Sequence, residues 1–152
     1  IVKMKLKATL VLIFIVILAT VLYSTLGGQK VDVVDVHRDD FAPVIVVKNF
    51  PSSPEEKITW WVKQSPDLLA RYSLKNKSTA IFRNFYIYDF GKGYQPLGKE
   101  DRLCFAEIKA PDNCLDKHIL MIVRERKDGH THFDINNETW QTDSHGDIVK
   151  DR

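Results

Sequence analysis

The sequence lacks the short motifs that mark the common catalytic centres. It has no G-x-S-x-G for a nucleophilic serine, no H-E-x-x-H for a zinc protease and no Cys and His pair at the spacing of a known family. Asp89-Phe90-Gly91 matches the D-F-G of protein kinases, but the chain has no Gly-rich loop and no V-A-I-K string, and its His37-Arg38-Asp39 is not followed by the L-x-x-x-N of the kinase catalytic loop. We therefore predict that the protein is not an enzyme, with no catalytic residue and no cofactor.

Cysteine is scarce, because Cys104 and Cys114 are the only two in 152 residues. Their C-x9-C spacing is not the C-x-x-C of thiol oxidoreductases, so the sequence gives no support to that class. An even count in an oxidising compartment favours a disulfide, and Pro111-Asp112-Asn113 between the two is typical of a turn. We predict that Cys104 and Cys114 are bonded. The alternative, two free buried thiols in a cytosolic domain, would require the opposite topology.

An excess of one charge is also missing from most of the chain. The net charge is +2, but three of the 22 Lys and Arg residues precede residue 8, which leaves 19 of them against 20 Asp and Glu. A nucleic-acid-binding domain needs a clustered basic surface. We therefore expect no nucleic-acid partner.

What the sequence does contain is one long apolar run. Ala8–Leu26 reads ATLVLIFIVILATVLYSTL and holds no charged residue. As a helix that rises about 1.5 Å per residue it spans roughly 28 Å, close to the bilayer hydrocarbon core of about 30 Å. The run predicts a transmembrane anchor at residues 8–26, between a basic cytoplasmic tail at 1–7 and a short linker at 27–30.

The charges that flank this run predict its orientation. Lys3, Lys5 and Lys7 precede it, and no acidic residue occurs before Asp32. Basic residues beside a transmembrane end stay in the cytoplasm, so we expect the domain at 31–152 on the far side. A start of translation at Ile1 or at Met4 keeps at least two of the lysines. A cleaved signal peptide is the alternative, although its apolar region normally runs about 7–15 residues and ends in a small-x-small site.

The remainder, residues 31–152, has the length of one domain of about 100–150 residues. Val31–His37 and Val44–Lys48 are β-branched runs around a polar group at 38–40, and they predict a β-hairpin with a central second strand. His118–Arg126 predicts another strand, and Ile148-Val149 a short edge strand. The fold class that we predict is α+β: a mostly antiparallel sheet with one or two packed helices, preceded by a single N-terminal transmembrane helix.

One helix start is strongly marked. Ser53 can cap, Pro54 suits the first turn, and Glu55 and Glu56 suit the positive end of the helix dipole. Pro66 interrupts the apolar stripe that follows, so we expect two short helices or one kinked helix. The stripe consists of Ile58, Trp61, Val62, Leu68, Leu69 and Tyr72.

Aromatic residues supply the candidate binding sites. Trp61 lies on the apolar stripe and is predicted to be core, whereas Trp60 either flanks the core or is an exposed anchor for a partner. Ala80–Phe90 carries large apolar residues on both faces, with Ile81, Phe85 and Ile87 on one and Phe82, Tyr86, Tyr88 and Phe90 on the other. This predicts a central strand buried on both sides, and a ligand groove lined by tyrosines is the alternative. The glycines of D-F-G-K-G-Y predict a tight turn. The candidate partner-binding residues are Trp60, Tyr86, Tyr88 and Tyr94.

The C-terminal part predicts a second hairpin. Asn136-Asn137 suits a two-residue type I′ turn between strands at 131–135 and 138–142, which places Phe133 opposite Trp140. A three-residue loop at 128–130 would then place Val123 opposite Ile135 and Arg124 opposite Asp134.

Two further groups of residues have candidate roles, one as a metal site and one as a structural ion pair. His130, His132 and Asp134 have metal-like alternate spacing, but the predicted register sets arginines beside them, so we expect a solvated face and no metal. Asp101-Arg102, next to Cys104, is predicted to form an ion pair that fixes the disulfide loop.

Seven strings, spread over nearly the whole chain, together resemble a known family. In order they are V-D-V-H-R-D (34–39), V-K-N-F-P (47–51), K-I-T-W-W (57–61), Y-D-F-G-K-G-Y (88–94), D-R-L-C-F (101–105), N-C-L-D-K (113–117) and G-D-I-V-K (146–150). They look like those of the enterobacterial putative membrane proteins catalogued as domain of unknown function 943. The resemblance implies a bacterial inner-membrane protein with a periplasmic domain, without implying any catalytic residue.

These observations lead to one expected function and one alternative. We expect a single-pass inner-membrane protein whose periplasmic domain binds an unknown protein partner, for example an immunity protein that neutralises a toxin. The alternative is a structural or sensory component of the cell envelope. Size, location and missing catalytic motifs motivate both.

Overall fold

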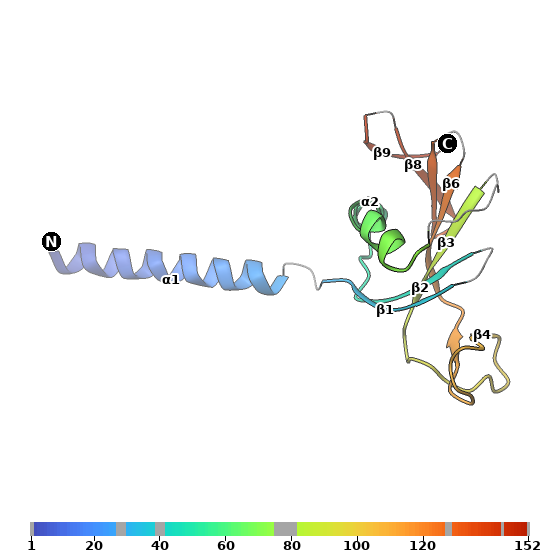
Figure 1. Ribbon diagram of the computed structural model, residues 1–152. Helices are drawn as coiled ribbons and strands as arrows, with labels where there is room; N and C mark the ends of the chain where they lie inside the picture. Colours follow the sequence, from blue (N-terminus) through green and yellow to red (C-terminus); the bar gives the residue numbers. More distant parts are fainter. Residues whose placement is uncertain are drawn as a thin grey trace. The chain divides into compact units, whose positions relative to one another are not determined.

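The structure is a computed structural model that describes residues 2–26, 30–38, 42–74, 82–126, 129–143 and 145–151. The chain divides into two compact units, Ile1–Lys30 and Val31–Arg152, which are drawn in Figure 1. Residues 27–29 of the predicted linker at 27–30, residues 39–40 of the polar group at 38–40, and Ile81 lie outside the described residues.

The first unit is one helix, α1 (Val2–Leu26). The consecutive residues Leu10–Leu18 are all large and apolar and so cover its whole circumference, and together with Val21, Leu22 and Tyr23 they are between 49% and 83% exposed. None of the helices in the part of the chain that the structure describes meets the length and apolarity that a membrane crossing requires.

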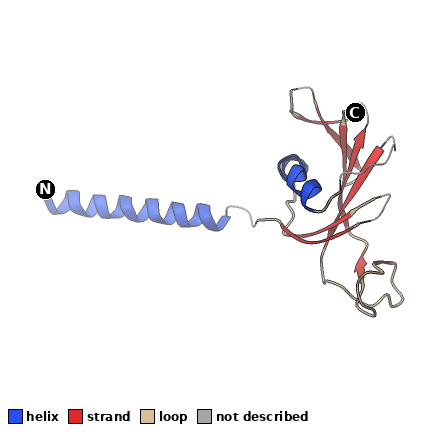
Figure 2. Ribbon diagram, viewed as in Figure 1, coloured by secondary structure: helices blue, strands red, loops and turns tan. Residues whose placement is uncertain are grey.

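The second unit is built on a seven-stranded sheet with the strand order β1-β2-β3-β6-β7-β8-β9 and a separate two-stranded sheet, β4-β5 (Figure 2). All neighbouring strands are antiparallel except β2 and β3. The α+β class and the mostly antiparallel sheet are therefore confirmed. The strands are β1 (Asp32–His37), β2 (Val44–Lys48), β3 (Phe82–Asp89), β4 (Arg102–Cys104), β5 (Cys114–Asp116), β6 (Ile119–Arg126), β7 (Thr131–Ile135), β8 (Glu138–Thr142) and β9 (Ile148–Lys150).

The predicted N-terminal hairpin is confirmed, since β1 pairs with β2 antiparallel and β2 lies inside the sheet. β2 and β3 are parallel because the helix α2 (Pro54–Arg71) connects them, as a crossover between parallel strands requires. α2 lies against one face of the sheet (Figure 1). Ile148–Lys150 forms the predicted edge strand beside β8.

The start of α2 follows the sequence closely. Ser53 is the N-cap, and its hydroxyl accepts a hydrogen bond from the backbone N–H of Glu56 at 3.3 Å. α2 remains one helix across Pro66, which lies on the exposed side, so that the lost backbone bond falls toward water. Val62 was expected on the buried stripe, and this is wrong because its side chain is 55% exposed.

Lys57 takes a buried place on α2 that no apolar pattern predicts. Lys57 is only 5% exposed, and its Nζ donates a hydrogen bond of 3.1 Å to the carbonyl of Leu120. Burial lowers the pKa of the Lys57 ammonium. The long aliphatic stem of a lysine can cover apolar surface while its charge reaches a polar atom.

The two faces of the sheet carry two apolar clusters. The cluster under α2 joins Trp61 of the helix to strand residues such as Phe85, whose ring centroid lies 5.0 Å from that of Trp61. Trp61 is 2% exposed, so its assignment to the core is confirmed. The cluster on the opposite face consists of Val44, Val46, Tyr88, Phe105 and Leu115, with Val34, Tyr86, Phe90, Tyr94, Leu103 and Ile108 packed against it.

The C-terminal hairpin is confirmed at its turn, but the preceding connection has a different register. Asn136 and Asn137 have φ of 52° and 63°, as a type I′ turn requires, and Phe133 pairs with Trp140. Val123 pairs with Phe133, so the predicted pairing of Val123 with Ile135 is wrong by two residues. A shift by two residues keeps each side chain on its predicted face, because side chains alternate along a strand.

Candidate functional site

A group of polar side chains around the buried His37 lies where β1 meets the inserted segment (residues 90–118), the stretch between β3 and β6. We call it the His37 cluster, and of the candidate partner-binding residues that the sequence suggested it contains Tyr94. Its members come from the end of β1, from the turn after β3 and from the residues that follow β4. They are Asp35, His37, Tyr94, Phe105 and Glu107.

β1 presents two polar side chains to this site. A β-bulge interrupts the β1–β2 register between Val33 and Asp35. Asp35 and His37 then share one face of the strand, while Val36 between them packs with the α2-side core. His37 is the last residue of β1 and pairs with Val44 of β2, so its backbone is fixed by the sheet.

The predicted tight turn brings Tyr94 to the cluster. Gly93 has φ of 85°, and a Cβ atom there would lie 3.1 Å from Cζ of Phe90. The turn closes with a bond of 2.7 Å from Gly93 N–H to the carbonyl of Phe90. The Tyr94 ring then lies edge-on to the rings of Phe90 and Phe105.

The disulfide hairpin supplies the other side of the cluster. Cys104 and Cys114 are bonded, which confirms the predicted disulfide, and they pair across β4 and β5. Phe105 follows directly, and its N–H donates to the carbonyl of Asn113 at 2.9 Å. The short loop that this closes places Phe105 and Glu107 over the end of β1.

His37 lies at the centre of these contacts, with its side chain 5% exposed. Nδ1 lies 2.6 Å from Oε1 of Glu107, and Nε2 lies 2.8 Å from the hydroxyl of Tyr94. Tyr94 donates its hydroxyl proton to Oδ2 of Asp35 at 2.9 Å. The Phe105 ring stacks on the imidazole at a centroid distance of 3.5 Å and an angle of 12°.

The surroundings shift two pKa values in the cluster. The backbone N–H of Glu107 and the His37 ring hold the pKa of the Glu107 carboxyl below its usual value. Burial and the bond to Asp35 raise the pKa of the Tyr94 phenol, so Tyr94 stays neutral at physiological pH. Glu107 is therefore an acceptor and Tyr94 remains a proton carrier.

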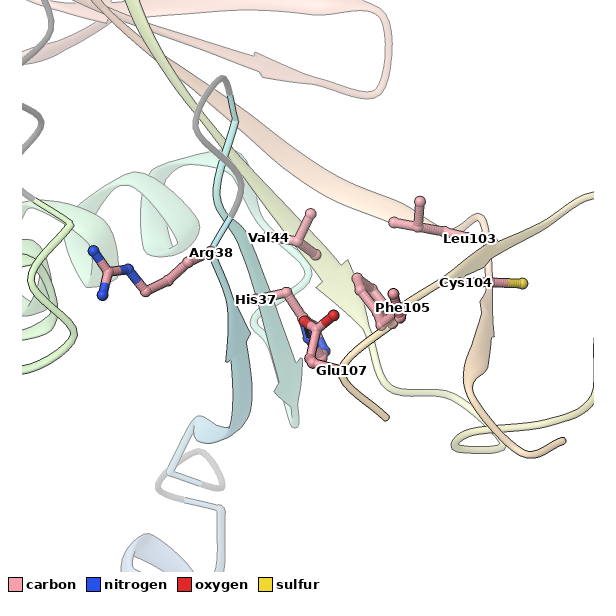
Figure 3. Close-up of a pocket in the computed structure, with 8 residues that line it drawn as sticks. His37, Arg38, Val44, Leu103, Cys104, Phe105 and Glu107 are labelled. Atoms are coloured by element: carbon pink, nitrogen blue, oxygen red, sulfur yellow. Dashed lines mark hydrogen bonds and ion pairs between the residues drawn. The ribbon is translucent and has the colours of Figure 1, made fainter. Parts of the chain in front are cut away.

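A cavity of about 170 Å³ adjoins the cluster. His37, Val44, Phe105 and Glu107 gather around it, whereas the side chains of Arg38 and Cys104 extend away (Figure 3). Both ring nitrogens of His37 are engaged, and the site offers no activated nucleophile. The arrangement is suited to holding a proton and joining two parts of the fold.

The four aromatic residues suggested as partner-binding do not form one surface. Trp60 lies on α2 and packs edge-on against Phe50 at 5.1 Å. Tyr86, Tyr88 and Tyr94 belong to the opposite face of the sheet. Tyr88 is 7% exposed and Tyr94 is bonded inside the His37 cluster, while Trp60 and Tyr86 are partly exposed.

The metal-like group on β7 has a different neighbour from the predicted one. Arg124 pairs with His132 in the strand register, so the predicted pairing of Arg124 with Asp134 is wrong. The Arg124 guanidinium nevertheless reaches diagonally to Asp134 as an ion pair. Over the described stretches of the chain, no three His, Cys, Asp or Glu side chains form a group able to hold a metal.

The disulfide hairpin is fixed by cross-strand ion pairs. Arg102 binds Asp116 at 2.8 Å, and Lys117 binds Asp101 at 2.6 Å. The predicted pair between Asp101 and Arg102 is therefore wrong. Adjacent residues of an extended strand point to opposite sides, so partners come from the facing strand.

Sequence reasoning did not find His37, Asp35 or Glu107 as a group. Their contacts join residues that are 57 to 70 positions apart. The available signal was a histidine at an inward position of an otherwise valine-rich strand, because a buried histidine needs partners for its nitrogens.

The chain belongs to a family described as enterobacterial putative membrane protein, domain of unknown function 943, whose sequence profile matches residues 2–152. No curated protein and no solved structure gives a significant match.

Proposed function

We propose that this member of the family is a single-pass inner-membrane protein whose second unit lies in the periplasm and binds a protein partner. The observation that carries the proposal is the surface of α1, which is apolar on every side and exposed. The family description, a membrane protein, agrees with it.

The burial free energy of the exposed side chains of α1 favours a membrane anchor. Each fully exposed large aliphatic side chain forgoes roughly 1.5–3 kcal/mol of burial free energy in water. A helix that is apolar all round finds that burial either in a protein core or in lipid. The proposed span is the whole apolar run of the sequence, Ala8–Leu26. A helix can cross the lipid because its backbone groups hydrogen-bond within the helix.

The orientation rests on lysines at one end and a disulfide beyond the other. Lys3, Lys5 and Lys7 favour a cytoplasmic N-terminus. The Cys104–Cys114 disulfide is a bond that persists in oxidising compartments such as the periplasm. The two features point to the same topology independently.

Partner binding is favoured over catalysis by the nature of the His37 cluster, whose polar atoms are satisfied by one another. Two partly exposed aromatic residues, Trp60 and Tyr86, are the first candidates for contact, one on each face of the sheet. A protein that neutralises a competitor's toxin at the membrane is one concrete form of this function.

A sensory role in the envelope is the second candidate, and one observation favours it. The His37 cluster joins β1, which follows the linker, to the inserted segment through titratable groups. Such a junction can respond to conditions outside the cell.

Topology and partner binding require separate tests. C-terminal fusions to alkaline phosphatase and to green fluorescent protein should give an active phosphatase and a dark fluorophore. The reverse pattern, or mature protein that lacks the N-terminal run, would refute the anchored periplasmic placement.

Partner contact can be mapped in living cells with a photo-crosslinking amino acid at position 60 and, separately, at position 86. We expect one specific adduct at one of the two faces. The exposed position 63 on α2 provides a nearby control for non-specific adducts. Absence of an adduct at both faces, with the protein expressed normally, would count against partner binding through these aromatic residues.

A further inference from the structure

The hydrogen bonds of the His37 cluster determine how many protons it holds. Tyr94 has one hydroxyl proton, and it is donated to Asp35. The Tyr94 oxygen must then accept a proton from Nε2 of His37, 2.8 Å away. Glu107 is a carboxylate that only accepts, so Nδ1 must donate as well. All three bonds exist together only when His37 is an imidazolium.

Loss of one proton from His37 leaves too few donors for all three hydrogen bonds. A neutral imidazole has one N–H, which remains on Nδ1 to serve Glu107. Nε2 then becomes an acceptor, so Tyr94 turns its proton from Asp35 to His37. Oδ2 of Asp35 loses the hydrogen bond from Tyr94, and the cluster makes two bonds in place of three.

We propose that the His37 cluster is a proton-operated junction that holds the inserted segment against β1 more firmly when His37 is protonated. Imidazole is the side chain whose charge normally changes between pH 5 and 8. The junction is therefore tighter where His37 carries its second proton and looser where it does not. This inference does not depend on a membrane anchor or on a partner.

The charges around His37 favour the protonated junction. From its own strand Asp35 faces it, with Oδ2 at 3.7 Å from Nε2, and from the inserted segment Glu107 and Tyr94 face it. The facing residue of β2 is the apolar Val44. Arg38, the neighbouring cation, extends away from the ring (Figure 3).

Solvent can exchange protons with this site. The Glu107 side chain is 57% exposed and the Asp35 side chain 43% exposed, although the ring between them is buried. The lowered pKa of Glu107 keeps its carboxylate charged below the usual titration range. The ion pair can thus form over the whole range in which an imidazole gains its proton.

The test measures local opening of the inserted segment by amide hydrogen exchange of the full chain in detergent micelles. The amides of Phe105 and Ile108 are the reporters, because they donate to Asn113 and Phe105 inside the loop. Rates at each pH are divided by the intrinsic rate for that pH. We expect the opening equilibrium to rise about fivefold from pH 5.5 to pH 8, the usual worth of one hydrogen bond. Amides of the β7–β8 hairpin report global unfolding, and an opening equilibrium for Phe105 and Ile108 that exceeds theirs identifies local opening of the inserted segment.

Three variants distinguish the effect of His37 protonation from the effect of side-chain packing. His37→Gln cannot titrate and should show no pH response. Tyr94→Phe keeps the imidazole but removes the transferable proton, and it too should lose the response, which covers the case in which His37→Gln does not fold. His118→Gln removes an exposed histidine paired with Asp89 and should respond as wild type does.

A constant opening equilibrium in the wild type, or one that falls as pH rises, would overturn the proposal. It would equally fail if Tyr94→Phe kept the full fivefold response, or if His118→Gln abolished it.

Discussion

The disulfide between Cys104 and Cys114 gives the sharpest quantitative prediction. The two residues are 10 positions apart. In the chain-entropy treatment, closing a loop of that length in the unfolded chain is worth roughly 2.7 kcal/mol. The hairpin itself has three residue pairs between β4 and β5. A short hairpin is only marginally stable alone, so the covalent bond should dominate its stability.

We therefore expect the double variant Cys104→Ala, Cys114→Ala to lose about 2.7 kcal/mol of unfolding free energy. Urea denaturation of the full chain in micelles can be followed by the fluorescence of its three tryptophans, all of which lie in the second unit. With an m-value of about 1–3 kcal/mol per molar, the midpoint should fall by about 1–3 M.

Reduction of the wild type supplies the matched control, because it breaks the bond without removing the sulfur atoms. Reduced wild type and the double variant should unfold at nearly the same urea concentration, and reductant should not affect the variant. A midpoint change of less than about 0.3 M, with loss of the bond verified by mass, would refute the assignment of this stability to loop closure.

Three further predictions concern the core, the helix start and an ionised group. Trp61→Ala should destabilise the protein by about 3–5 kcal/mol in urea denaturation, since Trp61 is 2% exposed, whereas Val62→Ala, at 55% exposure, should change stability by less than about 0.5 kcal/mol; equal effects would contradict the packing. Ser53→Ala should remove about 1 kcal/mol through loss of the cap in the same assay, and an unchanged midpoint would mean that water replaces the cap. The Glu107 pKa is lowered from 4.5 by folding, so its stabilising contribution is complete above that pH and is lost as the pH falls through the lowered value. Glu107→Gln should therefore flatten the acid limb of a midpoint-against-pH curve, and parallel curves for variant and wild type would show that Glu107 plays no part.

Local features could be predicted from sequence because neighbouring residues determine them. Ser53 and Pro54 specify a helix start within four residues, and Asn136-Asn137 specifies a hairpin turn within two. The hairpin of β1 and β2 follows from two β-branched runs that are close in the chain. In each case the deciding interactions are short-range.

The predictions from sequence were wrong where loop length determines the strand register or where a charged residue is buried. The pairing of β6 with β7 depends on how many residues the connection uses, and a two-residue difference leaves the alternating pattern unchanged. Lys57 was not expected inside because its charge masks an apolar stem. Local pattern cannot decide either case.

The candidate site was the least predictable part. The sequence suggests Tyr94 as a partner-binding residue, but its hydroxyl lies between Asp35 and His37. His37 and Glu107 are 70 positions apart, and the inserted segment must fold back over the sheet before they meet. A long-range contact of this kind leaves no periodic trace in the sequence.

The way the inserted segment leaves and rejoins the sheet has a consequence for how such chains diverge. Asp89 precedes it and His118 is its last residue, and the two are hydrogen-bonded neighbours, with Asp89 N–H donating to the His118 carbonyl at 3.0 Å. The inserted segment thus lies between two paired strands, β3 and β6, and contains its own disulfide. Its length and composition can change without altering how these strands pair. The main limit on such changes is the apolar surface of β2 and β3 that the segment covers.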